Sequence, residues 1–190
     1  MNKVFLKELK LIDNERIRES ISILLDNLPD YFYHIPASST GKYHPKSSLG
    51  EGGLVRHTKI AFYYAKEILG NPLYGKDFSN IEKDLMKGAI LLHDGIKKGF
   101  KEEEYTLFDH PLLATQFIKE NASKTSLREK EVLFLVHVIE SHMGIWNTNR
   151  DLSIELPIPK DKYQKFVHLC DFLASRKEIN LEFDKDNNII

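Results

Sequence analysis

The sequence predicts an all-α protein with a single domain. Its 190 residues fit one domain of ordinary size. Apolar residues recur at steps of three and four along six stretches, which is the spacing of one face of a helix. Glycine or proline marks most of the boundaries between these stretches, and no internal repeat or interdomain linker is visible. We therefore expect residues 1–190 to form one bundle of about six helices.

The first predicted helix occupies residues 1–30. Its apolar stripe runs from residue 3 to residue 28 and ends before Pro29, with an expected break near Asp13 and Asn14. Residues 29–53 are rich in glycine and proline, so we expect a long irregular segment there. Segments of this length inside a compact domain are usually functional, and we expect this one to shape a pocket.

Five further helices are expected from the remaining stripes. Two of them have clear start signals: Asp109 precedes a proline in the first turn, and Ser126 is followed three residues later by Glu129, as in a capping box. We expect the segment between the last two helices to form a surface loop that also shapes the pocket. We expect the tail, residues 177–190, to fray or to form a short strand pair. The five helices are expected over residues 53–69, 81–93, 110–121, 126–142 and 161–176, and the loop over residues 144–161.

The composition excludes several classes of protein. Lysine and arginine number 27 against 28 acidic residues, so there is no overall basic field to bind long nucleic acid. No apolar run approaches the roughly 18 residues that cross a bilayer. Residues 1–11 lack the pattern of a secretory signal, and the single cysteine, Cys170, suits a reducing compartment. We expect a cytoplasmic protein with no membrane partner.

Polar residues with metal-binding atoms fall on the apolar faces of several predicted helices. They are His57, the adjacent pair His93 and Asp94, His142 and Asp171. Burying these imidazoles and carboxylates without compensation would cost several kcal/mol for each charged group, roughly. A divalent cation would satisfy all of them together. The pattern therefore predicts a metal cluster inside the bundle.

Five segments of the chain, taken in order, resemble the HD superfamily of metal-dependent phosphohydrolases. The resemblance covers residues 43–176 as the HD core and leaves the first helix and the tail outside. The sequence around His57 and His142 resembles the branch of this superfamily that includes exoribonuclease-type and nucleotide-cleaving members. The segments are Gly52-Gly53-Leu54-Val55-Arg56-His57-Thr58, Leu91-Leu92-His93-Asp94-Gly95-Ile96-Lys97, Asp109-His110-Pro111, Ser141-His142-Met143-Gly144 and His168-Leu169-Cys170-Asp171-Phe172-Leu173-Ala174-Ser175-Arg176.

The resemblance implies a binuclear metal centre. A first metal is expected on His57, His93, Asp94 and Asp171, and Asp94 is expected to bridge to a second metal on His110 and His142. Mixed imidazole and carboxylate ligands suit manganese, iron, nickel, cobalt or zinc, and one or two ions are expected.

The chain departs from the family pattern at two points. Gly95 and Ile96 stand in the reverse of the usual order before Lys97, and Met143 replaces a second histidine found in some relatives. The first departure is expected to shift Lys97 slightly, and the second argues against a third metal.

The implied reaction is hydrolysis of a phosphate ester in a nucleotide or short oligonucleotide, by a hydroxide that bridges the metals. The expected partner is a small phosphorylated substrate, with short nucleic acid as another possibility; the oligomeric state is not predicted. Asp94, Lys97 and Arg176 are the expected catalytic residues, the two cations by binding phosphate oxygens, and Lys98 is a weaker candidate.

Other residues near the motifs have alternative roles. His137 lies about 140° from His142 around a helix and is read as a core, pocket or supporting residue. His168 is a candidate partner that orients a carboxylate. Trp146 reads as a loop anchor or a platform for a base, while His44 and Arg56 read as ordinary surface residues or as part of the substrate entrance. Cys170 is expected to have no catalytic role.

Two alternatives stay open at this point. Some HD-like proteins with the same six ligands hold two irons and activate dioxygen, so an oxygenase or oxidase is the nearest rival. A module that only binds a nucleotide is the other, and the complete ligand set disfavours it.

Overall fold

The described part of the chain is mostly helical, as predicted. The computed structural model describes residues 3–39, 41, 44–177 and 181–190. Residues 1–2 of the predicted first helix, residue 43 of the predicted core and residues 178–180 of the predicted tail lie outside the described residues. None of the described helices combines the length and apolar character needed to cross a bilayer.

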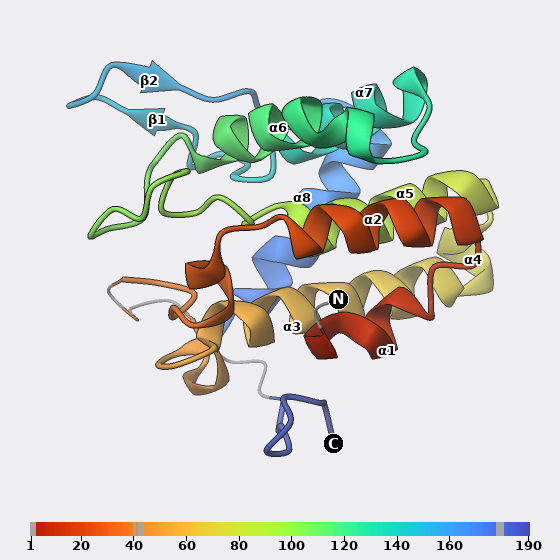
Figure 1. Ribbon diagram of the computed structural model, residues 1–190, viewed down its shortest axis with the longest axis horizontal. Helices are drawn as coiled ribbons and strands as arrows, with labels where there is room; N and C mark the ends of the chain where they lie inside the picture. Colours follow the sequence, from red (N-terminus) through yellow and green to blue (C-terminus); the bar gives the residue numbers. More distant parts are fainter. Residues whose placement is uncertain (1–2, 40, 42–43, 178–180) are drawn as a thin grey trace.

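The helices follow one another with short connections, apart from three longer segments before α3, α6 and α8, the last of which contains a hairpin (Figure 1). In chain order the described elements are η1 (Lys3–Phe5), α1 (Leu6–Leu9), α2 (Glu15–Asp26), η2 (Asp30–Tyr33), η3 (Lys46–Ser48), α3 (Gly53–Gly70), α4 (Pro72–Gly75), α5 (Asn80–Leu92), α6 (His110–Asn121), η4 (Ala122–Lys124), α7 (Glu129–Ile139), β1 (Thr148–Asn149), β2 (Ile154–Glu155) and α8 (Lys162–Ala174).

Helices α3 and α5 form the centre of the bundle. Helix α3 packs against α5 and α8, and α5 also packs against α2 and α7, while α6 covers α7. Their apolar stripes meet in one core that includes Leu54, Ile90, Leu135 and Val167. Figure 1 shows α6 and α7 on one side of α2 and α5, and α3 on the other side.

The predicted break in the first helix is present between α1 and α2. The side chain of Asn14 accepts a hydrogen bond from the backbone N–H of Ile17 and so caps α2. The carboxylate of Asp84 on α5 accepts the N–H groups of Asp13 and Asn14, at 3.1 and 2.8 Å. The buried carboxylate therefore satisfies backbone donors that the break leaves without helical partners.

Helix α7 begins later than the predicted residue 126. The N–H of Ser126 donates to Ser20 Oγ, which holds Ser126 in the preceding loop. Glu131 accepts the N–H of Arg128 at 2.8 Å and pairs with both terminal nitrogens of Arg16, at 2.6 and 2.7 Å. A partner distant in sequence therefore helps to fix this start, and the predicted box of Ser126 and Glu129 is wrong.

Two strand pairings lie in segments without a helical pattern. The antiparallel hairpin of β1 and β2 pairs Thr148 with Glu155 and Asn149 with Ile154, inside the predicted surface loop. In the tail a single bridge joins Phe183 to Ile189, which agrees with the strand-pair alternative for the described tail residues.

Gly53 and Gly70, the first and last residues of α3, differ in the space around them. A Cβ on Gly53 would lie 2.3 Å from the backbone oxygen of Ser48, whereas nothing lies within 4 Å of a Cβ on Gly70. Gly53→Ala should therefore destabilise the fold by about 1 to 3 kcal/mol, because a backbone atom cannot move aside cheaply. Gly70→Ala is the matched control and should be neutral or stabilising by up to about 1 kcal/mol. Urea unfolding of the two variants measures the difference, and equal stabilities would contradict this packing.

Candidate metal centre

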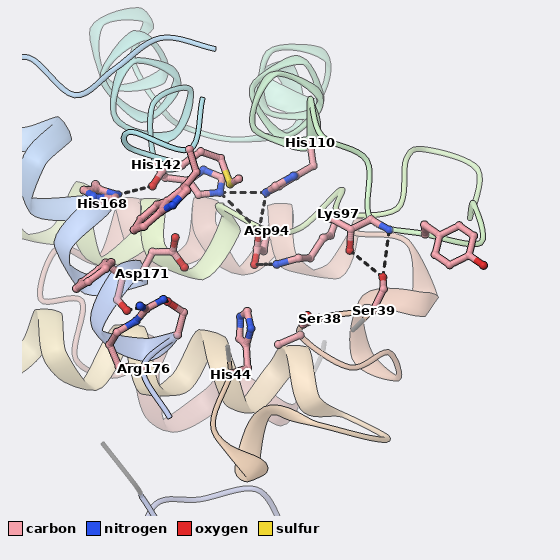
Figure 2. Close-up of a pocket in the computed structure, with 17 residues that line it drawn as sticks. Ser38, Ser39, His44, Asp94, Lys97, His110, His142, His168, Asp171 and Arg176 are labelled. Carbon is pink, nitrogen blue, oxygen red and sulfur yellow. Dashed lines mark hydrogen bonds and ion pairs between the residues drawn. The ribbon is translucent and has the colours of Figure 1, made fainter. Parts of the chain in front are cut away.

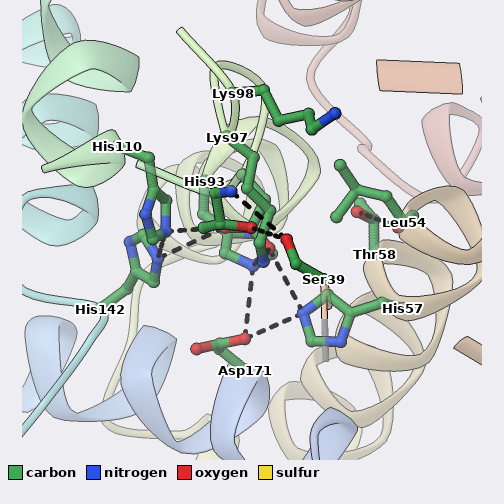
Figure 3. A network of polar contacts seen from close by, with 12 residues as sticks. Ser39, Leu54, His57, Thr58, His93, Lys97, Lys98, His110, His142 and Asp171 are labelled. Carbon is green, nitrogen blue, oxygen red and sulfur yellow. Dashed lines mark hydrogen bonds and ion pairs between the residues drawn. The ribbon is translucent and has the colours of Figure 1, made fainter. Parts of the chain in front are cut away.

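Six side chains from five helical segments point toward one another (Figures 2 and 3). The five nearest the core expose 2% or less of their surface, and Asp171 exposes 21% of its side chain. Three overlapping sets of these residues have donor atoms within 4.8 Å of one another. The six are His57 in α3, His93 and Asp94 directly after α5, His110 at the start of α6, His142 in the turn after α7 and Asp171 in α8.

The carboxylate of Asp94 lies between two groups of donors. Its Oδ2 is 3.7 Å from His57 Nε2 and 3.5 Å from His93 Nε2. Asp171 Oδ1 joins this first group, at 2.9 and 3.4 Å from the same two nitrogens. The other oxygen of Asp94, Oδ1, is 3.0 Å from His110 Nε2 and 3.6 Å from His142 Nε2. Asp94 thus has one oxygen near each group, and His142 also lies within 4.8 Å of His93 and Asp171 of the first group.

Backbone carbonyls fix the tautomers of three of the histidines. In each, Nδ1 lies close to the carbonyl oxygen three residues earlier: His93 to Ile90 at 2.7 Å, His110 to Leu107 at 2.7 Å and His142 to Ile139 at 2.8 Å. A carbonyl only accepts, so Nδ1 carries the proton and donates it. In the neutral ring Nε2 then presents a lone pair toward the cluster, which is the arrangement of a metal-ligating histidine.

These lone pairs face acceptors rather than donors. His110 Nε2 lies 3.1 Å from His142 Nε2, so two neutral rings in these tautomers have no proton to share. Asp94 Oδ1 and His93 Nε2 are buried and have no hydrogen-bond partner among the described residues. Buried polar groups are rarely left in this state without a cation or water between them. The residues present therefore fit one or two divalent cations.

The charges in the cluster shift the pKa values of its members. Burial by itself would raise the pKa of Asp94, but Lys97 and the nearby histidines hold that pKa well below its usual range. Burial would also raise the pKa of Asp171, but His57 and His93 hold that pKa well below its usual range. Burial lowers the pKa of His110 and so favours its neutral, ligating form. At His93, burial alone would lower the pKa. The negative charges of Asp94 and Asp171 outweigh burial, so the pKa of His93 is raised.

The structure corrects the predicted positions of His93 and His142 on helices. Helix α5 ends at Leu92 and α7 at Ile139, so both histidines lie in the turns that follow. The last carbonyls of a helix have no helical partner. An imidazole just beyond the helix can bind such a carbonyl, and this is why Nδ1 of each ring is held while Nε2 points inward.

A cavity of about 620 Å³ opens onto the cluster. Asp94, His110, His142 and Asp171 line it, together with both predicted cations, Lys97 and Arg176, and with His44, Met143 and Trp146. Lys97 Nζ lies 2.5 Å from Asp94 Oδ2. The Arg176 guanidinium lies 4.4 Å from the ring centre of Phe172, and its buried Nε has no hydrogen-bond partner among the described residues.

Lys98 and Arg56 do not line this cavity. Lys98 pairs with Glu102 at 3.2 Å. The Arg56 guanidinium donates to the carbonyls of Leu49 and Glu51, and it also holds Asn187 of the tail at 2.9 Å. Arg56 therefore fixes the loop before α3, which corrects its reading as part of the substrate entrance.

Two other histidines differ from their predicted roles. His137 is 45% exposed at its side chain and lies 2.5 Å from Asp161 Oδ2, so it is a surface residue. His168 Nδ1 donates to the carbonyl of His142 at 2.7 Å instead of orienting a carboxylate. Its ring also packs on Gly144, where a Cβ would lie 2.2 Å away. His168 therefore holds the turn that carries His142.

One wall of the cavity consists of residues that the sequence analysis does not predict to be part of the site. Tyr105 and Thr106, between α5 and α6, line it beside Ser38 and Ser39 of the predicted pocket segment. The only available signal was their position in the chain between two ligand motifs. Cys170 is buried and burial raises the pKa of its thiol, in keeping with the absence of a predicted catalytic role.

Comparisons with known proteins add no relative: no family model, no curated protein and no solved structure matches this chain. The arguments for function therefore rest on the residues and geometry of the site.

Asp94→Asn should lose metal, because it removes the charge that faces both donor groups while keeping the shape of the side chain. We expect the affinity for Mn²⁺, Co²⁺ or Zn²⁺ to fall by more than about 10-fold, the low end for loss of even an outer partner of a metal ligand. His137→Ala is the control and should bind metal as the wild type does. Equilibrium dialysis with elemental analysis measures both, and full metal content in Asp94→Asn would contradict the site.

Proposed function

We propose that the protein is a metal-dependent hydrolase that cleaves a phosphate ester of a nucleotide or short oligonucleotide, and that it belongs to the HD superfamily. The observation that carries the proposal is a buried cluster of inward lone pairs and carboxylates that shares its cavity with two cations, Lys97 and Arg176. Metal ligands and positively charged side chains in one cavity suit an anionic substrate.

The donor set supports a binuclear centre. Asp94 offers one oxygen to each group of ligands, and its pKa well below the usual range keeps it ionised at neutral pH. Imidazole with carboxylate suits manganese, iron, nickel, cobalt or zinc. Bound divalent cations would lower the pKa of a water and neutralise charge on a phosphoryl oxygen.

Lys97 is the residue best placed to bind a phosphate oxygen beside the cluster. An ammonium has three donors, and one of them is directed at Asp94. Lys97 also lines the cavity, so its other donors are available to a bound anion. A fixed positive charge there would stabilise the negative charge that develops on the phosphoryl group.

Arg176 supplies the second cation from the end of α8. Within the described residues it forms no ion pair, and its hydrogen bond at 3.0 Å goes to Ser175 Oγ. Its guanidinium therefore keeps donors for a phosphate, which it can hold through two parallel hydrogen bonds. Lys97 and Arg176 lie on different sides of Asp94 in the cavity (Figure 2).

The function is tested with purified protein freed of metal and reloaded with each candidate metal. We expect release of phosphate or of nucleoside from nucleoside mono-, di- or triphosphates or from short oligonucleotides, and no release without metal or with Asp94→Asn. Absence of hydrolysis with every metal would overturn the proposal. Oxygen uptake by the iron form in that case would favour the oxidase alternative, and nucleotide binding alone would favour a binding module.

The neighbouring lysines Lys97 and Lys98 give a matched pair of variants. Lys97→Met should lower kcat by about 100-fold or more, the usual loss when one donor to a developing oxyanion is removed. Lys98→Met should change it by no more than about two-fold, because Lys98 pairs with Glu102 and does not line the cavity. Equal effects of the two substitutions in steady-state assays would show that Lys97 has no special role.

A further inference from the structure

The cavity extends beyond the donor cluster on two sides. Figure 2 shows Asp94 and His142 between His168 and Arg176 at one end and Ser38 and Ser39 at the other. A phosphorus atom held at the cluster would therefore have cavity on both sides of it. At about 620 Å³ the cavity has the size of a site for a ligand much larger than phosphate.

One end of the cavity, which we call the aromatic arm, consists of Trp146, Phe172 and Arg176. The rings of Trp146 and Phe172 are stacked, with centroids 5.7 Å apart and planes 9° from parallel. The Arg176 guanidinium lies over Phe172, at 4.4 Å from its centre. Trp146 nevertheless exposes 51% of its surface. A half-exposed indole held in place by a stacked neighbour is a suitable platform for a planar base.

The other end, which we call the hydroxyl arm, consists of Ser38, Ser39, Tyr105 and Thr106. Ser39 Oγ lies 3.3 Å from Thr106 Oγ1 and accepts the N–H of Thr106 at 3.4 Å, so the two wall segments meet there. Hydroxyl groups both donate and accept hydrogen bonds. A wall of such groups suits a polar group such as a sugar better than a second charged phosphate, which would call for cations.

We propose that the substrate is a phosphate diester lying across the cluster, with a nucleobase in the aromatic arm and a sugar-bearing group in the hydroxyl arm. This inference rests on the proposed phosphate-ester hydrolysis. A monoester has a substituent on one side of its phosphorus and would leave one arm to solvent. In the reaction one water adds to phosphorus, the bond to one ester oxygen breaks, and that oxygen takes up a proton. A monoester and an alcohol result, without oxidation or reduction.

Three related compounds test the geometry: a dinucleotide, thymidylyl-thymidine; the methyl ester of thymidine monophosphate; and thymidine monophosphate itself. With the metal-loaded enzyme, kcat/KM should fall in that order, because each step removes the occupant of an arm or one ester group. We expect the dinucleotide to exceed the monoester by at least about 5-fold, the usual effect of one hydrogen bond gained in the hydroxyl arm. A monoester cleaved as fast as the dinucleotide would overturn the diester inference and leave the proposed function intact.

Binding gives a second readout that needs no metal or turnover. Trp146 is the only tryptophan of the chain, so the intrinsic tryptophan fluorescence reports on the aromatic arm alone. Thymidylyl-thymidine should quench this fluorescence in the metal-free protein, and methyl phosphate should not. Absence of quenching by the dinucleotide at concentrations that support turnover would contradict base stacking on Trp146.

Variants of adjacent residues separate stacking from general damage. Trp146→Ala should raise KM for the dinucleotide by roughly 5- to 150-fold, the range for loss of one stacked base, and Trp146→Phe should restore most of the affinity. Ile145→Ala is the control, since Ile145 is 75% exposed and does not line the cavity. An unchanged KM in Trp146→Ala would show that the arm does not hold the base.

Discussion

The buried carboxylate of Asp94 is the charge around which the ends of the helices are arranged. A carboxylate with 2% exposure is stable only if positive charge or hydrogen-bond donors surround it. Among the described residues, Lys97 is the only lysine or arginine at hydrogen-bond distance from it. Of the four imidazoles nearby, the three whose tautomer is fixed present a lone pair to the cluster. One lysine cannot satisfy this set. Further positive charge at the cluster, such as a bound cation, would therefore stabilise the buried carboxylate and the inward lone pairs. In the proposed function, the same charge would activate a substrate.

The ends of the helices supply what a rigid ligand set needs. Carbonyls that a helix leaves free hold His93 and His142 by Nδ1, and the carbonyl of Leu107 does the same for His110 before α6 begins. Each ring is thereby fixed by backbone that also belongs to the packed core, so its orientation does not depend on a flexible side chain. The irregular segments then add walls of the cavity, through Ser38 and Ser39 before α3 and Tyr105 and Thr106 before α6.

Much of the fold follows from local patterns, and the remainder depends on distant partners. The stripes over 53–69 and 81–93 agree with α3 and α5 because apolar spacing and Gly or Pro boundaries are local signals. The predicted start of α7 is wrong because Arg16, far away in the sequence, helps to fix the true start through its ion pair with Glu131. The apolar helix faces and the motifs predict the six proposed ligands, and these residues lie together in the structure. A helical position alone does not predict burial, since His137 lies in a helix and is exposed at the surface. Tyr105 and Thr106 had no local signal, because only the folded chain brings their loop over the cavity.

The contact of His168 with Gly144 has a mechanical consequence. Gly144 has a φ of +64° and leaves no room for a Cβ against the imidazole, so α8 and the turn after α7 are in van der Waals contact at this point. Asp171 lies on that same helix, and His142 and Trp146 flank that glycine on the same turn. Any sliding of α8 along α7 would therefore alter the gap between the two halves of the donor set and the tilt of the indole in one movement. The proposed metal site and the proposed aromatic arm therefore share one packing contact, that of His168 with Gly144.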